Sequence, residues 1–184
     1  MASRPTFNQN DIAPALRDEE NSPLINRALN ACHPGSLFKI LLAAAALAEN
    51  KVTPEEQFLC QGHIEINPQV TINCWKEEGH GQISFTGALA NSCNPAFIAA
   101  GLKLGRSDLL KYARELEITD TTIIGYPDNQ LNSFIKIDSG QAALANASIG
   151  QQGVMLTPLQ LTSLLATIAD DGWYKSPVLV KYTV

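Results

Sequence analysis

The pattern of apolar and polar positions along the chain predicts a protein built mainly of helices. The strongest signal is a helix from residue 36 to about residue 50, because the apolar run from Ile40 to Ala48 is rich in alanine and Asn50 ends it. Serine, threonine, aspartate or proline precedes most of the other apolar stretches, as is common at helix starts. Those stretches predict further helices over residues 85–90, 96–104, 109–116, about 139–147 and 157–170. We expect Ser84 to cap the first of these helices and Asp138 or Ser139 to cap the fourth.

Two short segments with alternating apolar residues predict one small β-hairpin. They cover residues 63–66 and 70–72, and a turn at Asn67 and Pro68 joins them. Residues 1–30 follow neither a helical nor a strand period, and residues 119–134 read as a long polar loop. Residues 176–184 have the pattern of a strand. The pattern therefore predicts a mainly α fold with a small β-hairpin.

Composition and charge argue against a nucleic-acid-binding protein and against a membrane span within these residues, but they do not indicate a function. The chain has 184 residues, of which 45% are hydrophobic, enough to build a core. Its formal net charge of -5 offers no basic surface for a nucleic-acid backbone, so we expect no nucleic-acid partner. The run from Ile40 to Ala48 is far shorter than a membrane span, and no apolar leader follows Met1. We therefore expect that an export signal or membrane anchor either does not exist or lies outside these residues.

Four cysteines, at positions 32, 60, 74 and 93, are too few for a disulfide scaffold in a chain of this length. Cys60 and Cys74 flank the predicted hairpin, so either a bridge between them or two buried free thiols fits the sequence. Cys60, His63, Cys74 and His80 can also be drawn as a zinc quartet. The spacing lacks the paired Cys-x2-Cys of common zinc modules, so we expect no metal site and no cofactor.

The first candidate for chemistry is the turn Pro34-Gly35 followed by Ser36 and Lys39. Residues three apart on a helix are neighbours, so the amine of Lys39 can accept the proton of the Ser36 hydroxyl if it loses its own charge. The apolar context of Lys39 favours that loss. A helix start at Ser36 also favours developing negative charge. This predicts a serine nucleophile with its own base.

The second candidate is Ser92-Cys93-Asn94, which lies in a tight connection between two predicted helices. Taken alone, Asn94 is explained as an ordinary helix cap, and a Ser-x-x-Lys match alone is explained as a capped helix with a solvated lysine. Both motifs in one chain are far more specific than either one.

Together these residues resemble the penicillin-binding proteins, the serine D,D-transpeptidases of peptidoglycan synthesis. The matching stretches are His33-Pro34-Gly35-Ser36-Leu37-Phe38-Lys39, Gly79-His80-Gly81, Asn91-Ser92-Cys93-Asn94-Pro95-Ala96-Phe97, and Gly150-Gln151-Gln152-Gly153 with Thr157-Pro158-Leu159-Gln160. They occur in the family's order and span most of the chain. The resemblance is closer to the large synthases than to β-lactamases.

The resemblance implies a role for each matched residue. Ser36 would be the acylated nucleophile, Lys39 its general base, Ser92 a proton relay to the leaving amine, and Asn94 a group that binds the substrate amide and orients Lys39. The backbone amide of Ser36 would be one oxyanion-hole donor. The substrates would be peptidoglycan stem peptides, and β-lactams would be trapped as acyl-enzymes.

The resemblance also implies that the chain is one partial domain of a parent protein. No Lys-Thr-Gly or Lys-Ser-Gly, the family's third motif, occurs in residues 1–184. We therefore expect the helical subdomain of an α/β transpeptidase fold over residues 31–172, after the irregular lead-in at 1–30, with most of the central sheet missing. This piece would acylate slowly or not at all and would self-associate through uncovered apolar faces.

The parent protein would act on the extracytoplasmic face of the bacterial cell membrane, anchored by a segment outside this chain and working within a cell-wall synthesis complex. Two other functions remain open from the sequence. One is a β-lactamase or β-lactam sensor, which shares the Ser36 motif, and the other is a non-catalytic helical interaction module.

Overall fold

The computed structural model describes residues 5–119 and 131–178. A 3-10 turn, η1 (Gly35–Leu37), leads directly into the central helix α2 (Phe38–Ala48). The other helices are α1 (Ala13–Arg17), α3 (Phe85–Ala90), α4 (Asn94–Leu104), α5 (Arg106–Glu115), α6 (Gln141–Ser148) and α7 (Pro158–Ala169). The strands are β1 (Gln57–Cys60), β2 (His63–Asn67), β3 (Val70–Asn73), β4 (Gly81–Ser84), β5 (Phe134–Ile135) and β6 (Val154–Met155).

The core lies where α4 packs between α2 and α6, with α3 and α5 against its ends. Small residues let these helices approach closely. A Cβ atom added to Gly101 of α4 would lie 2.0 Å from the hydroxyl of Ser148 in α6. Phe38, Leu41 and Phe97 are fully buried at this junction. The core therefore fixes α2 and α4, the two helices that begin at the candidate motifs.

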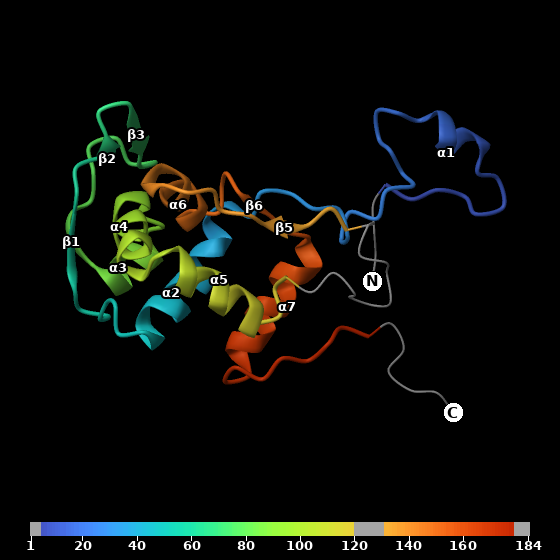
Figure 1. Cartoon of the computed structure of the whole chain (residues 1–184). Helices are drawn as coiled ribbons and strands as arrows, with labels where there is room; N and C mark the ends of the chain where they lie inside the picture. Colours follow the sequence, from blue (N-terminus) through green and yellow to red (C-terminus); the bar gives the residue numbers. More distant parts are fainter. Residues whose placement is uncertain (1–4, 120–130, 179–184) are drawn as a thin grey trace.

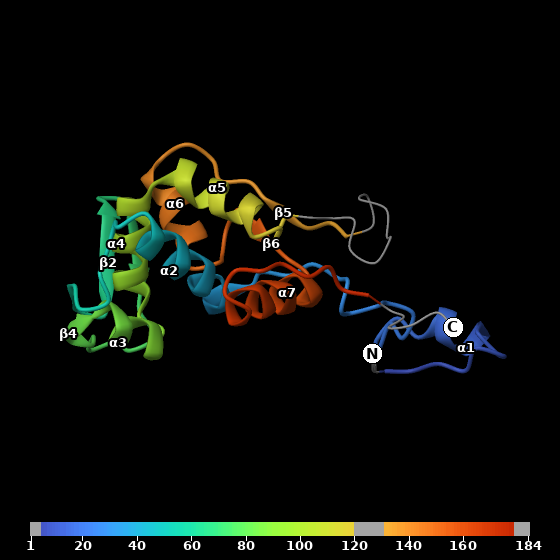
Figure 2. The same ribbon diagram turned by 90° about the horizontal axis from the view of Figure 1, so that it is seen from below.

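Every sheet within the described residues has two antiparallel strands. β1 pairs with β4, β2 with β3, and β5 with β6. The hairpin β2–β3 lies between β1 and β4 in the sequence, and β1 pairs with β4. The C-terminal end of β1 therefore lies beside the N-terminal end of β4, close to the end of β3. Figures 1 and 2 show the strands β1 to β4 at the end of the molecule that also carries α3 and α4.

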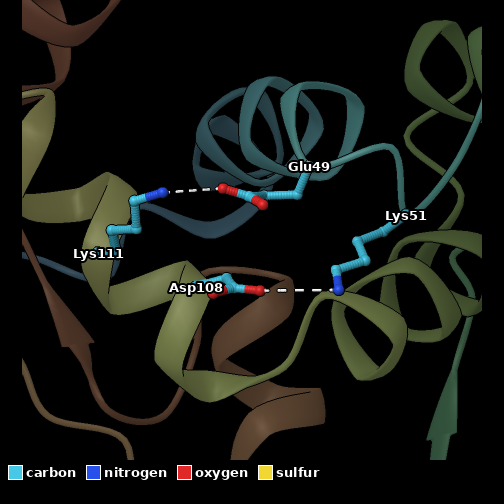
Figure 3. Close-up of polar contacts among 4 residues, drawn as sticks. All are labelled: Glu49, Lys51, Asp108 and Lys111. Carbon is cyan, nitrogen blue, oxygen red and sulfur yellow. Dashed lines mark hydrogen bonds and ion pairs between the residues drawn. The ribbon is translucent and has the colours of Figure 1, made fainter.

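Two ion pairs join the C-terminal end of α2 to α5 (Figure 3). Glu49 accepts a 2.9 Å hydrogen bond from the amine of Lys111, and the amine of Lys51 lies 3.9 Å from a carboxylate oxygen of Asp108. All four side chains are partly exposed, so water screens both pairs and they contribute little to stability.

The N-terminal segment, with α1, lies at the opposite end of the molecule from the strands β1 to β4. Figures 1 and 2 both show α1 projecting away from the bundle of α2 to α6, with α7 between the two regions. None of the helices in the described ranges combines the length and the apolar character that a bilayer crossing requires.

The structure confirms most of the predicted elements. The helix after Ser36, the hairpin, α3, α4 and α7 lie where the sequence predicts them, and the hydroxyl of Ser84 caps α3 as expected. Residues 5–30 are irregular apart from α1. α5 begins at Arg106, three residues before its predicted start, directly after Gly105.

Other predictions were wrong or stay open. The expected cap of α6 by Asp138 or Ser139 was wrong, because Gly140, with φ of 109°, precedes the helix and no side chain caps it. Residues 120–130 of the predicted loop and 179–184 of the predicted strand lie outside the described residues, and 176–178 form no strand. That the chain is one partial domain, with most of a larger sheet elsewhere, stays a prediction.

Candidate active site

The candidate nucleophile lies on a turn that a second segment holds in place. The amide of Gly35 donates a 2.9 Å hydrogen bond to the carbonyl oxygen of Gly150, which follows α6. Gly150 has φ of 69°, and a Cβ atom there would lie 2.1 Å from the carbonyl oxygen of Gly35. Only glycine permits this approach. The Gly150–Gly153 motif therefore supports the turn that presents Ser36.

His33 also joins the turn before Ser36 to the segment that follows α6. Its Nδ1 lies 3.1 Å from the carbonyl oxygen of Gln151 and 2.9 Å from that of Val154. Since both partners are acceptors, Nδ1 carries the proton and donates. A backbone bridge between Cys32 and Leu156 continues the contact. The sequence placed His33 in the matching motif but gave it no role, because its partners are more than 100 residues away.

Lys39 is the buried centre of the site. Its side chain is on the first turn of α2, and the residue is 1% exposed. The amine donates to Asn94 Oδ1 at 2.7 Å, to the Ser92 carbonyl oxygen at 2.8 Å and to Ser92 Oγ at 3.0 Å, and lies 3.3 Å from Ser36 Oγ. No carboxylate of the described residues pairs with it. Lys39 thus contacts every other predicted catalytic group.

Ser92 connects the nucleophile to this amine. Its hydroxyl donates a 2.8 Å hydrogen bond to Ser36 Oγ, although the two residues are 56 positions apart. The residue has φ of 51°, in the left-handed region that non-glycine residues rarely adopt. The strained conformation lets the short connection between α3 and α4 turn both the hydroxyl and the carbonyl of Ser92 toward Lys39.

Asn94 begins α4 and holds the site together by both ends of its amide. Oδ1 accepts from Lys39, and Nδ2 donates a 2.9 Å hydrogen bond to the carbonyl oxygen of Asn73 at the end of β3. Each end of a carboxamide can make a second hydrogen bond. Asn94 therefore has one donor and one acceptor direction left for a ligand.

The electrostatics suit a general base. Burial away from water lowers the pKa of Lys39 from its ordinary 10.5 to about 8, while the nearby thiols of Cys74 and Cys93 act in the opposite direction. The ring of Phe97 lies 5.6 Å from the amine. An amine with this pKa is neutral in a useful fraction of molecules near neutral pH, so it can take the proton of a serine hydroxyl that touches it.

The structure brings together Ser36, Lys39, Ser92 and Asn94, all four residues that the sequence proposed for the site. Of the four residues considered as zinc ligands, Cys60, Cys74 and His80 lie together, but His63 is exposed on β2. Cys93 is the fourth residue of the cluster instead of His63. All four cysteines are free thiols in this structure, so Cys60 and Cys74 are not bridged.

Comparison with known proteins identifies the family of this chain. The family model described as the penicillin-binding protein transpeptidase domain matches residues 1–184. A peptidoglycan D,D-transpeptidase, PbpA from Mycolicibacterium smegmatis, is 35% identical over 186 residues, which cover 98% of this chain and 38% of that protein.

Solved structures show the same fold. The penicillin G acyl-enzyme complex of penicillin-binding protein A from M. tuberculosis superposes with a TM-score of 0.85 at 29% identity, covering 96% of this chain and 44% of that one. A peptidoglycan synthase complex that coordinates polymerization and crosslinking contains a chain with a TM-score of 0.85 at 28% identity, covering 99% and 34%. The chain thus spans less than half the length of these proteins. It belongs to the penicillin-binding protein transpeptidase family.

Proposed function

We propose that the parent protein is a peptidoglycan D,D-transpeptidase that acts through an acyl-enzyme on Ser36. The observation that supports this most directly is the buried amine of Lys39, within hydrogen-bond distance of Ser36, Ser92 and Asn94. The similarity to a protein named as a D,D-transpeptidase, and to one found as a penicillin G acyl-enzyme, supports the same reaction.

The first step forms the acyl-enzyme. Neutral Lys39 takes the proton of Ser36 Oγ, which attacks the carbonyl carbon between the two terminal D-alanines of a stem peptide. The C–N bond breaks as Lys39 passes the proton to the leaving amine through Ser92. The hydroxyl of Ser92 is hydrogen-bonded to both the Lys39 amine and Ser36 Oγ. Terminal D-alanine departs and an ester on Ser36 remains. We expect the backbone amide of Ser36 to be one donor to the oxyanion.

The second step resolves the ester. An amine from a neighbouring stem peptide attacks the acyl carbon, Lys39 accepts its proton by way of Ser92, and Ser36 regains its hydrogen when the C–O bond breaks. The free donor and acceptor directions of Asn94 are suited to the backbone amide of the stem peptide. A β-lactam would stop at the first step because its leaving group stays attached.

The partners of the parent protein follow from its substrate. We propose stem peptides and β-lactams as its ligands and the extracytoplasmic face of the bacterial membrane as its place of action. Its likeness to a chain of a peptidoglycan synthase complex supports work within such an assembly. Anchoring by a segment outside residues 1–184 belongs to the same proposal.

For the 184-residue chain studied by itself we propose slow acylation and self-association. Several large apolar side chains are well exposed, among them Leu16 (65%), Trp75 (66%) and Trp173 (74%). Exposed apolar side chains of this size favour association between copies. A monomeric chain that labels rapidly and stoichiometrically with a fluorescent penicillin would contradict this part of the proposal.

The test of the function uses the parent protein, a D-Ala-D-Ala stem peptide and an acceptor amine. We expect release of D-alanine and formation of the cross-linked product by the wild type and by the control Ser107→Ala, whose residue is exposed on α5, and loss of both in Ser36→Ala. Equal activity of Ser36→Ala would favour a non-catalytic module. Rapid turnover of a chromogenic β-lactam would favour a β-lactamase.

A further inference from the structure

Trp75 is a large aromatic side chain that is exposed and yet held in place beside the second catalytic motif. The residue is 66% exposed, although tryptophan is on average one of the more buried residues. Its indole Nε1 donates a 2.8 Å hydrogen bond to the carbonyl oxygen of Asn91, the residue before Ser92. His80 packs edge-on against the ring, with 5.4 Å between the ring centroids. Water could satisfy an exposed N–H group, so this fixed placement calls for another reason.

Ser92 lies at a helix end where glycine is the usual residue. α3 ends with Asn91 as its C-cap, and Ser92 follows with φ of 51°. The amide of Ser92 donates to the Leu89 carbonyl oxygen at 3.1 Å, and the amide of Cys93 donates to the Ala88 carbonyl oxygen at 2.9 Å. These two bonds form a Schellman motif, whose left-handed position favours glycine. A serine in that position is strained, so its conformation depends on supports from outside α3.

The segment at the end of β3 supplies such a support on both sides of Ser92. Before Ser92, the indole of Trp75 bonds the carbonyl oxygen of Asn91. After Ser92, the side chain of Asn94 donates its 2.9 Å hydrogen bond to the carbonyl oxygen of Asn73, the last residue of β3. Two residues of one short segment therefore hold the strained connection at both of its ends.

We propose that Trp75 is a positioning residue that holds Ser92 in place for proton transfer to the leaving amine, an inference that rests on the proposed function. The carbonyl of Asn91 belongs to the planar peptide group that leads into Ser92. A bond that fixes this carbonyl therefore helps to fix φ of Ser92. That angle directs the Ser92 hydroxyl to the Lys39 amine at 3.0 Å and to Ser36 Oγ at 2.8 Å.

The chemistry of the leaving group separates this role from a general loss of structure. The amine that leaves from a peptide bond needs a proton, which Ser92 passes to it, whereas the thiolate that leaves from a thioester needs none. Attack by Ser36 on either substrate needs only the neutral amine of Lys39, which keeps its own bond to Asn94. Loss of the Trp75 bond should therefore slow a peptide substrate more than a thioester.

The first test compares two substrates with the same acyl group in the parent protein, a D-Ala-D-Ala stem peptide and its thioester, by single-turnover rates of acylation. Trp75→Phe keeps an aromatic ring and removes the N–H donor. Because a hydrogen bond between neutral groups is worth a factor of about five, we expect acylation by the peptide to slow about fivefold and by the thioester less than about twofold. The control Trp173→Phe, at the chain's other tryptophan, should keep both rates. Equal slowing of both substrates, or no slowing, would overturn the proposal.

A double-mutant cycle tests whether Trp75 acts through Ser92. In a Ser92→Ala background the relay hydroxyl is absent, so Trp75→Phe should cause no further slowing of acylation by the peptide. A second loss of about fivefold in that background would mean that the indole acts on another group, and the proposal would be wrong.

A third measurement needs no catalytic activity. Hydrogen exchange of the parent protein reports the amides of Ser92 and Cys93, whose bonds close the end of α3. We expect both amides to exchange faster in Trp75→Phe than in the wild type or in Trp173→Phe, and equal exchange in all three proteins would contradict the support. An inactive parent protein with the expected exchange would refute the proposed function alone. An active wild type with an unaffected Trp75→Phe would refute this inference alone.

Discussion

The burial of Lys39 predicts how the rate of Ser36 acylation depends on pH. With a pKa of about 8, the amine is neutral in about 9% of molecules at pH 7, whereas a lysine with the ordinary pKa of 10.5 would be neutral in about 0.03%. Burial therefore raises the amount of active base at pH 7 by about 300-fold. Only the neutral amine can take the Ser36 proton, so the rate should rise with pH and level off above the pKa.

The assay is the second-order rate of labelling of the parent protein by a fluorescent penicillin between pH 6 and pH 9.5. We expect a rise of about tenfold per pH unit at the acid end, a midpoint near pH 8 and a plateau above it. Lys39→Arg keeps the charge at every pH and should abolish labelling. The control Lys103→Arg, at a lysine that also lies over a phenylalanine ring but pairs with Glu56, should keep the wild-type profile. A flat profile, or a rate that falls from pH 7 to pH 9, would refute the role of Lys39 as base.

Three substitutions test the supports of the site. Asn94→Ala removes the 2.7 Å bond that orients the amine of Lys39 toward Ser36. A hydrogen bond between neutral groups is worth about 1 kcal/mol, so labelling should slow by about fivefold, and an unchanged rate would mean that Asn94 does not orient the base. Gly150→Ala pushes a methyl group into the Gly35 carbonyl and should slow labelling even in molecules that circular dichroism shows to be folded, whereas a normal rate would mean that the turn is not held there. Thr157→Ala breaks the capping box of α7 and should lower the free energy of unfolding by about 1 kcal/mol, or the melting temperature by about 2–4 °C. The control Thr162→Ala, on the exposed side of the helix, should lower the melting temperature less, and equal losses would contradict the capping argument.

The local signals in the sequence were enough to predict most helices. Ser84 and Thr157 cap α3 and α7 through hydrogen bonds made within three residues, so the sequence around each helix start contains the whole interaction. Lys39 and Ser36 likewise meet because a helical turn brings them together. The link from Ser36 to Ser92 came from the resemblance to the family, since their contact crosses 56 positions.

What the sequence did not predict depends on contacts between distant segments. β5 and β6 have two residues each, and such short strands leave no periodic pattern. His33 contacts residues more than 100 positions away, and Cys93 lies near Cys60, 33 positions earlier. Both contacts depend on how distant elements pack, which no local sequence pattern predicts. Spacing along the chain suggested His63 as a ligand, yet alternation along β2 turns its side chain to the surface.

The proposed function requires that Ser36 is the acylated residue. The most direct measurement is the mass of the parent protein after reaction with penicillin G, followed by peptide mapping of the adduct. We expect one adduct per chain, on the peptide that contains Ser36, and none in Ser36→Ala. An adduct on Ser92 or on another serine, or an equal yield of adduct in Ser36→Ala, would contradict it.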